Sequence, residues 1–254
     1  MEDRHEQNDD FQDVISQSAS YLYSLAYRLT GSSDDAKDLV QETYFKAFKK
    51  WSQFEHKKRP IPWLRKICIN TFIDNKRRLD RKKDIPGLDS FLIDHRIATD
   101  IPTPEDELLA EEGVQTVHSR CFSIFTQNLP LYQKIAFVLI DIFHLSISET
   151  AILIDKTEPA TRALLHRART KITQPVSEIC SLVLPHNYCQ CASWVRYADD
   201  AQKRKAYIHS ILAHSQANPH EVADMKKKLI SLFNNLPLIQ PSDNWFEEVK
   251  KTFR

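Results

Sequence analysis

Residues 62–78 of this chain read Pro62-Trp63-Leu64-Arg65-Lys66-Ile67-Cys68-Ile69-Asn70-Thr71-Phe72-Ile73-Asp74-Asn75-Lys76-Arg77-Arg78. Within this stretch, apolar side chains recur three or four positions apart, at Leu64, Ile67, Cys68 and Phe72. This spacing predicts an amphipathic helix with one face in a core. The remaining faces are polar and mainly basic. A cationic helix is therefore expected in the middle of the first half of the chain.

Positive charge is concentrated around this helix. Residues 46–83 contain fourteen Lys or Arg and three acidic residues, a local net charge of +11, whereas the whole 254-residue chain carries only +1. The same region contains the aromatic residues Trp51, Phe54, Trp63 and Phe72. A cationic surface with aromatic side chains suits contacts to nucleic-acid phosphates and stacking on unpaired bases. The alternative is a solvated helix face whose aromatic residues are core anchors.

Two blocks in this half resemble the extracytoplasmic-function (ECF) group of bacterial sigma factors. One is Asp35-Ala36-Lys37-Asp38-Leu39-Val40-Gln41-Glu42-Thr43, and the other runs from Trp63-Leu64-Arg65-Lys66-Ile67 through Asn70 and Asp74 to Arg77-Arg78. The resemblance implies polymerase-binding residues on the first block, at Asp38, Gln41 and Glu42. It also implies that the basic helix binds the melted minus-ten element of a promoter, through Trp63, Arg65, Asn70, Asp74, Arg77 and Arg78.

Alternatives remain open for these blocks. Most relatives have an acid at the position of Lys37, which leaves the charge pattern of the polymerase contact open. Acids near a helix N-terminus also gain from its dipole, so Asp38 can be an ordinary solvated residue. Asp74 can orient Arg77 or Arg78 instead of touching DNA.

Two helices are expected before the basic one. Residues 11–29 and 34–51 both carry an apolar stripe at helical spacing. Gly31 suits the left-handed position that ends the first helix, and Ser32 or Ser33 can cap the second. The acidic residues 1–13 carry no structural signal, so they are predicted to form a disordered arm.

Residues 84–112 differ in character from the helices before them. They contain nine Asp or Glu against the single Arg96, together with Pro86, Gly87, Pro102 and Pro104. A segment of this composition has little to bury, which predicts a flexible acidic linker. The family resemblance implies that the linker threads into the active cleft of the polymerase.

Helical patterns resume after the linker. Apolar spacing predicts helices at residues 111–125 and 132–143, followed by a pair at 146–155 and 159–172. Ser146 or Ser148 can cap the first helix of the pair, and Thr157 can cap the second, where Pro159 is tolerated in the first turn. Two short helices around a tight turn, the second of them basic, predict a helix-turn-helix that enters the major groove.

This second half again resembles the ECF group. The matching residues are Leu129-Pro130, Leu145-Ser146, Thr150-Ala151, Ile154 and Leu165-His166-Arg167-Ala168-Arg169. The resemblance implies a domain that reads the minus-thirty-five element through Thr161, Arg162, His166, Arg167 and Arg169. Arg167 and Arg169 are expected at phosphates or at the carbonyls that end the helix. Departures from the common family pattern leave the promoter sequence open, at Pro159, Ala160 and Leu164.

Residues 173–254 exceed what a minimal member of this family needs. They contain four groups that can hold zinc or copper, Cys180, His186, Cys189 and Cys191. The usual pair of Cys-x2-Cys motifs is absent, and buried Cys beside aromatic residues is often core. Helical patterns at 198–217, 220–234 and 245–253 predict a helical extension. It either docks on the DNA-binding domains and holds them off promoter or polymerase, which is an inhibitory role, or forms a passive packing appendage.

Composition excludes several classes of protein. The chain has only three Gly, which favours helices over sheets, and no apolar run reaches the about 18–20 residues that span a bilayer. The polar N-terminus has no signal-peptide core, so we expect a cytoplasmic protein with no membrane partner and with reduced cysteines. Neither a glycine-rich phosphate loop nor a nucleophile motif is found, and we expect no enzyme.

The sequence thus predicts an all-α protein. Two small helical DNA-binding domains, residues 14–83 and 113–172, are joined by the flexible acidic linker and followed by a helical extension at 173–254. The family resemblance implies the function of a sigma factor, which binds core RNA polymerase, recognises duplex and single-stranded promoter DNA and stabilises melted DNA without a required cofactor. An anti-sigma factor is a candidate partner. The rival predictions are an autonomous helix-turn-helix regulator and a metal-binding protein built on the Cys tail.

Overall fold

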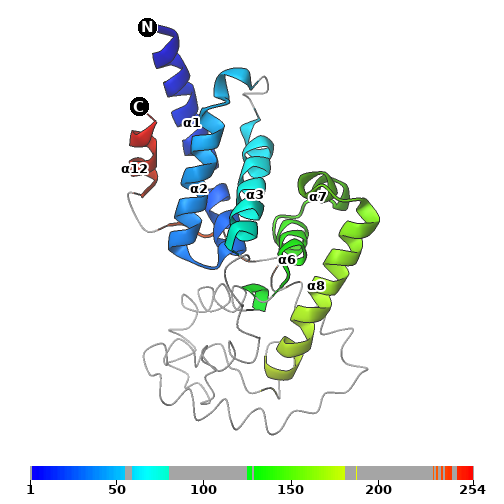
Figure 1. Cartoon of the computed structure of the whole chain (residues 1–254). Helices are drawn as coiled ribbons and strands as arrows, with labels where there is room; N and C mark the ends of the chain where they lie inside the picture. The colour runs from blue at the N-terminus through cyan, green and yellow to red at the C-terminus, as the bar shows by residue number, and fades with distance from the viewer. Residues whose placement is uncertain are drawn as a thin grey trace, which may run out of the picture. The chain divides into compact units, whose positions relative to one another are not determined.

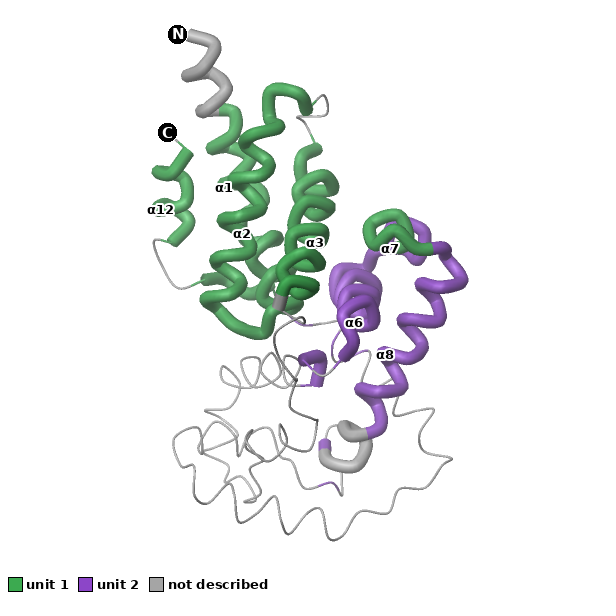
Figure 2. Tube along the Cα trace, viewed as in Figure 1, with its two compact units in different colours: residues 1–83, 151–156, 238–254 green, residues 84–150, 157–237 purple. Residues whose placement is uncertain are grey.

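The computed structural model describes residues 2–54, 59–79, 125–127, 129–180, 187, 231, 233, 236, 238–241 and 245–253. The regular elements in these ranges are helices, and no β-strand is among them, which confirms the all-α prediction. The chain divides into two compact units (Figure 2). The first unit contains residues 1–83, 151–156 and 238–254, and the second contains residues 84–150 and 157–237.

The first unit is built from helices at both ends of the chain (Figure 1). It contains α1 at Glu2–Thr30, α2 at Ser33–Phe48, a 3-10 turn, η1, at Trp51–Gln53, and α3 at Pro60–Leu79. α12, at Trp245–Thr252, packs against α1. The three long helices bury most of the apolar stripe that the sequence predicts, because these side chains recur at helical spacing, although Ile67 is only half-buried. Buried members include Ile15, Leu22, Leu25, Leu39, Val40, Leu64, Cys68 and Phe72.

A glycine turn joins α1 to α2, as predicted. Gly31 has a φ of 77°, and its N–H donates to the carbonyl oxygen of Tyr27 at 2.8 Å. This left-handed conformation suits Gly because it has no Cβ to clash. Ser32 is the N-cap of α2, and its hydroxyl accepts a hydrogen bond from the N–H of Asp35 at 3.4 Å.

The start of the chain corrects the prediction of a disordered arm at residues 1–13. α1 begins at Glu2, and Phe11 is fully buried. The ring of Phe11 packs at steep angles against Phe48 and Trp51, with centroids 5.2 and 5.4 Å away. This tertiary contact stabilises a helical segment whose own sequence carries no such signal. Trp51 lies in η1, so α2 ends at Phe48 rather than at residue 51.

The second unit differs in detail from the expected helices. α6 spans Leu131–Phe137 and continues as a π-helical turn, η2, at Val138–Ile142, where one uninterrupted helix was expected over 132–143. α8 spans Glu158–Ile179 and is longer than the predicted 159–172. α7, at Ile147–Ile154, precedes α8 in the chain, and its residues from 151 onward are grouped with the first unit.

Local caps define the starts of α7 and α8. The N–H of Ser146 donates to Glu149 Oε2 at 2.9 Å, and the N–H of Glu149 donates to Ser146 Oγ at 3.1 Å, which is a reciprocal capping box. Thr157 Oγ1 accepts from the N–H of Ala160 at 3.3 Å. Asp155, with a φ of 53°, follows the last residue of α7. These contacts confirm the caps that the sequence predicts at Ser146 and Thr157.

Several predictions lie outside the described residues. They are the acidic linker at 84–112, nearly all of the helix expected at 111–125, the helix expected at 198–217 and most of the one at 220–234. In the described part of the chain, no helix combines the length and the apolar character needed to cross a bilayer.

Candidate nucleic-acid interface

One side of α3 presents polar and aromatic side chains. Trp63 is half-buried, and Asn70, Asp74 and Arg77 are exposed. Successive spacings of seven, four and three residues bring these side chains onto one line along the helix. We call Trp63, Asn70, Asp74 and Arg77 the α3 stripe. All four are among the residues that the sequence predicts at the melted promoter.

Trp63 is held by other aromatic rings at the start of α3. Its ring is stacked on Phe54, with the centroids 4.2 Å apart and the planes at 11°. The centroid of Trp51, which is 2% exposed, lies 5.8 Å from that of Phe54 and 6.1 Å from that of Trp63. Packing therefore fixes the orientation of the Trp63 ring and covers one of its faces.

Arg65 and Arg78 contact neighbouring side chains of the first unit. The guanidinium carbon of Arg65 lies 5.7 Å from the ring centroid of Tyr21, within the range of a cation–π contact. Arg78 donates a hydrogen bond to the side-chain oxygen of Asn75. The sequence predicts both arginines at the melted promoter, and in the structure both also contact a neighbouring side chain of the first unit.

Glu42 is tied to α3 by a polar network. Asn75 Nδ2 donates to Glu42 Oε2 at 2.9 Å, and Lys46 Nζ forms an ion pair with Oε1 at 2.9 Å. Lys46 Nζ also donates to Thr71 Oγ1 at 3.1 Å. Burial raises the pKa of Glu42, but hydrogen bonds from Asn75 and Lys46 and the charges of Lys46 and Arg78 outweigh it, so that this pKa lies below its ordinary value of 4.5. Glu42 is therefore anionic at neutral pH.

The outer side of α2 is open to solvent. Asp38 and Gln41 are exposed, and Phe45 lies one turn beyond Gln41 with 51% of its surface exposed. Lys49 Nζ lies 4.2 Å from the ring centroid of Phe45. Phe45 is not among the predicted site residues, although a large apolar residue outside the apolar stripe of α2 is a signal that could have found it. We call Asp38, Gln41, Glu42 and Phe45 the α2 face.

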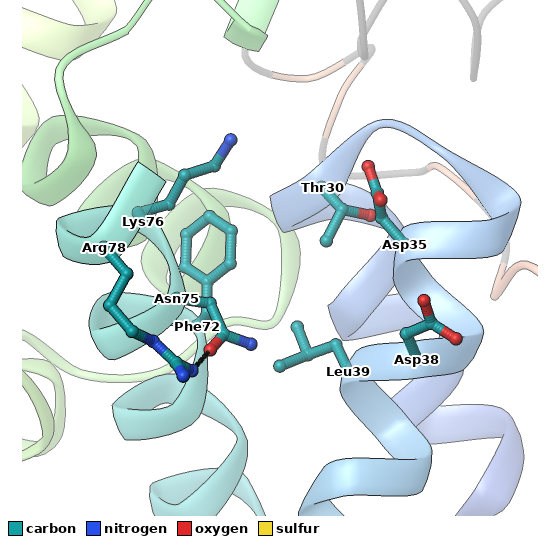
Figure 3. Close-up of a pocket in the computed structure, with 8 residues that line it drawn as sticks. All are labelled: Thr30, Asp35, Asp38, Leu39, Phe72, Asn75, Lys76 and Arg78. Carbon is teal, nitrogen blue, oxygen red and sulfur yellow. Dashed lines mark hydrogen bonds between the residues drawn. The ribbon is translucent and has the colours of Figure 1, made fainter. Parts of the chain in front are cut away.

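A recess of about 390 Å³ lies between the start of α2 and the end of α3 (Figure 3). Its two acids are on α2 and its two basic residues are on α3, with Leu39 and Phe72 pointing into the gap between the helices. Opposite charges therefore line the two sides of an apolar centre. No sequence pattern marks the recess, because it depends on how α2 packs against α3. The lining residues are Thr30, Asp35, Asp38, Leu39, Phe72, Asn75, Lys76 and Arg78.

The predicted residues of α8 differ in exposure. Arg162, His166 and Arg167 are exposed, and Arg162 forms an ion pair with Glu158 at 2.9 Å. Thr161 is buried, and its hydroxyl donates to the carbonyl oxygen of Thr157 at 3.0 Å. The exposed residues are spaced four and one positions apart, which places them on neighbouring lines of the helix surface.

Arg169 is bound to a buried acid. Its Nε and Nη2 donate to the two carboxylate oxygens of Asp141, at 2.9 and 2.5 Å. Asp141 is 3% exposed and lies in η2, so this fork joins α8 to the π-helical turn. The hydrogen bond to Asp141 raises the pKa of Arg169. Asp141 is absent from the predicted site, and the signal for it was a lone acid within a strongly apolar segment.

Most of the candidate metal ligands lie outside the described residues. Cys180 is described and half-buried, whereas His186, Cys189 and Cys191 are not described. Within the described ranges, no group of three or more His, Cys, Asp or Glu could hold a metal ion. Cys68 is buried in the core, and this burial raises its pKa to about 12.

Two segments of the chain match known protein families. Residues 14–82 match Sigma-70 region 2, and residues 126–172 match Sigma-70 region 4. The first segment contains the α2 face and the α3 stripe. The second contains the exposed residues of α8 and the Asp141–Arg169 pair.

Named relatives of the chain are ECF RNA polymerase sigma factors. SigW of Bacillus subtilis is 24% identical over 178 residues, which cover 67% of this chain and 91% of SigW. SigE of Mycolicibacterium smegmatis is 29% identical over 165 residues, which cover 63% of this chain and 59% of that protein. Among solved structures, the sigma factor RpoE in complex with the anti-sigma factor NepR from Bartonella quintana is 21% identical, with a TM-score of 0.47, and the match covers 66% of this chain and 97% of that one.

Proposed function

We infer that this chain belongs to the extracytoplasmic-function group of the sigma-70 family, and we propose that three of its described surfaces carry out separate functions of a sigma factor. The α2 face binds core RNA polymerase, the α3 stripe binds melted promoter DNA, and the exposed residues of α8 bind duplex promoter DNA. The observation that carries this proposal is the presence of regions 2 and 4, in that order, on a helical chain. Sigma factors act by binding, and we propose no catalytic step for this chain.

The α2 face has features of a protein interface. Asp38 and Gln41 offer exposed polar groups, and Phe45 supplies an apolar centre. The recess beside Asp38 is large enough to accept a side chain of the polymerase. Hydrogen bonds already hold Glu42 in one orientation, so little side-chain freedom is lost on binding. A protein of the anti-sigma class that covers this face would compete with the polymerase.

The α3 stripe suits a separated DNA strand. Trp63 offers a fixed aromatic surface, Asn70 offers an amide for a base edge, and Arg77 offers a charge for a phosphate. Asp74 lies one turn from both Asn70 and Arg77, and it can orient either of them. Capture of unpaired bases lowers the free energy of melted DNA relative to the duplex, and this difference favours opening. Arg65 and Arg78 act as positioning residues, through Tyr21 and Asn75.

In this proposal, α8 is the recognition helix of the helix-turn-helix. Arg162 and His166 are exposed one turn apart, and such side chains can reach base edges and phosphates in the major groove. The ion pair between Arg162 and Glu158 is on the surface, so its loss on DNA binding costs little. Thr161 is buried and Arg169 is held by Asp141. We therefore assign these last two residues to the stability of α8 rather than to DNA contact.

Run-off transcription with purified core polymerase tests the proposal. Templates are selected from a randomised promoter library, because the residues of α8 do not fix the promoter sequence. The full chain is expected to direct transcription from defined start sites that core polymerase alone does not use. If no such start is found and the chain instead binds duplex DNA tightly without polymerase, the autonomous regulator becomes the better description.

Two substitutions separate the proposed roles. Arg77→Ala is expected to reduce open-complex formation about tenfold, the effect of losing about 1.4 kcal/mol of contact energy, with unchanged affinity for core polymerase. Asp38→Ala is expected to weaken the binding of core polymerase. Lys251→Ala removes another exposed charge, on α12, and is the matched control for Arg77→Ala. Normal open-complex formation by Arg77→Ala would exclude the α3 stripe from this role.

A further inference from the structure

The end of the chain packs against the helix that begins it. The N–H of Ile239 donates to Ser24 Oγ at 3.2 Å, and Ser20 Oγ donates to Gln240 Oε1 at 2.9 Å. α12 lies beside α1 within the first unit (Figures 1 and 2). Its Trp245 ring centroid is 5.7 Å from that of Tyr23. Residues 238–241 and 245–253, which we call the C-terminal segment, are therefore part of the fold of the first unit.

Phe253 places its ring in a cluster of aromatic residues from α1 and α2. It is 3% exposed, and its centroid lies 5.5 Å from Phe11, 5.4 Å from Phe48 and 6.4 Å from Tyr44. These separations are within the range in which tilted and edge-on aromatic pairs attract. The last aromatic residue of the chain thus completes a core whose other members come from the first fifty residues.

The aromatic contacts continue from this cluster to the α3 stripe. Phe11 lies 5.4 Å from Trp51, and Trp51 contacts both Phe54 and Trp63, which are stacked on each other. An unbroken series of rings therefore connects Phe253 to Trp63. Closely packed interiors transmit a displacement from one side chain to the next, because they contain little free volume.

The C-terminal segment leaves the α2 face open. Asp38 and Gln41 remain exposed while α12 is packed against α1, and Phe45 is half-exposed. In this position the segment does not cover the proposed polymerase contact. The arrangement therefore favours a supporting role over an inhibitory one.

We propose that the C-terminal segment is a positioning element for the binding of melted DNA. Phe253 acts through Phe11 and Trp51. In this way it holds the stacked rings of Phe54 and Trp63 in the orientation that binds the separated DNA strand. The inference rests on the proposed function, because the orientation of Trp63 matters only if Trp63 binds DNA. The segment lies beyond both matched regions, at 14–82 and 126–172, so neither region assigns it a role.

Hydrogen exchange of the full-length chain tests the physical link. The N–H groups of Gln53 and Phe54 each donate to a carbonyl of η1 or its cap at 3.1 Å, and their exchange rates report on this turn. Phe253→Ala is expected to speed their exchange about tenfold, because the ring that packs on Phe11 is lost. Leu238→Ala removes a side chain that is 52% exposed in the same segment, and it should leave these rates unchanged. Equal exchange in Phe253→Ala and in the wild type would overturn the inference.

Promoter opening tests the role of the segment. Phe253→Ala is expected to form about fivefold fewer open complexes, with unchanged affinity for core polymerase, because a misplaced binding group is less effective. Phe253→Leu keeps most of the apolar volume, and it replaces the alanine variant if that variant fails to fold. It should shift both measurements in the same direction by a smaller amount. The inference would be overturned if Phe253→Ala speeds amide exchange in η1 but opens promoters normally. It would also be overturned if this variant loses affinity for core polymerase by the same factor as it loses open complexes.

The two measurements also separate this inference from the proposed function. If the wild-type chain opens no promoter, the proposed function fails and the positioning role fails with it, while hydrogen exchange still decides whether Phe253 supports η1. If the wild type opens promoters and both Phe253 variants do so equally well, only the positioning role fails.

Discussion

Cys68 illustrates how burial decides which side chains are available for chemistry. It lies in the middle of the basic helix α3, yet its side chain is fully buried on the core side. Burial raises the pKa of its thiol to about 12, against the opposing effect of a hydrogen bond with Thr43. Because the thiolate is the reactive form, a buried and protonated thiol is chemically inert at neutral pH.

We predict that iodoacetamide at pH 8 labels Cys68 more than about 100-fold more slowly in the folded chain than in the denatured chain, because so little thiolate is present. Mass spectrometry of the Cys68 peptide measures this rate. The half-buried Cys180 is the internal comparison, and its peptide should be labelled faster under native conditions. Rapid labelling of Cys68 at native conditions would mean that α3 separates readily from the rest of the first unit.

Residue type alone does not show which arginines of α3 contact other parts of the first unit. The sequence groups Arg65, Arg77 and Arg78 because each matches a family position. In the structure, Arg65 contacts Tyr21 and Arg78 contacts Asn75. The contact of Arg65 with Tyr21 joins α3 to α1, and the helical pattern of α3 alone does not contain that information.

At the level of helices, the boundary signals that depend on adjacent residues were predicted well. Gly31, Ser32, Ser146 and Thr157 all occupy the expected turn or cap positions. These predictions hold because a cap is a hydrogen bond between residues two or three positions apart. The π-helical turn was missed, since it lies where Asp141 binds Arg169, a residue 28 positions away.

The contact between α2 and α3 gives a prediction about Glu42. Its lowered folded-state pKa means that its interactions stabilise the fold above the ordinary value of 4.5, and this contribution is lost as the pH falls through the lowered pKa. Asn75→Ala removes one hydrogen-bond donor and is expected to raise the pKa of Glu42. NMR titration of the Glu42 carboxyl carbon measures the change. Asp74→Ala changes an exposed neighbour that makes no contact with Glu42, and the titration should then stay as in the wild type.

The contact between α8 and η2 gives a prediction about stability. Arg169→Ala removes the guanidinium that binds both carboxylate oxygens of the buried Asp141, which is expected to cost about 3 kcal/mol of unfolding free energy. Thermal and urea unfolding of the full chain, followed by circular dichroism, measure the loss. Arg167→Ala removes an exposed arginine from the same helix, and it should change stability by less than about 0.5 kcal/mol. A similar effect of both substitutions would argue against a stabilising role for the Asp141–Arg169 fork.

On the scale of the whole molecule, charge and chain order organise the function. The basic stretch at 46–83 is followed by the acidic stretch at 84–112, although the total charge is only +1. Together with the two matched regions, this segregation of charge supports the interpretation that the basic stretch attracts DNA and the acidic stretch repels it. The first unit also contains helices from both ends of this sequence, since α12 packs on α1.

The sequence by itself determined the helical class, the order of the two sigma-70 regions, the turn at Gly31 and the caps of α7 and α8. The class, the turn and the caps depend on apolar spacing or on hydrogen bonds between near neighbours, and the order of the two regions rests on short motifs that resemble the family, so the information is local in each case. Only the tertiary structure decided that Phe11 anchors a helix from Glu2, that Arg169 binds Asp141, and that Phe253 returns to pack on α1. These contacts join residues that are far apart in the chain, and their free energy exists only after the helices have packed together.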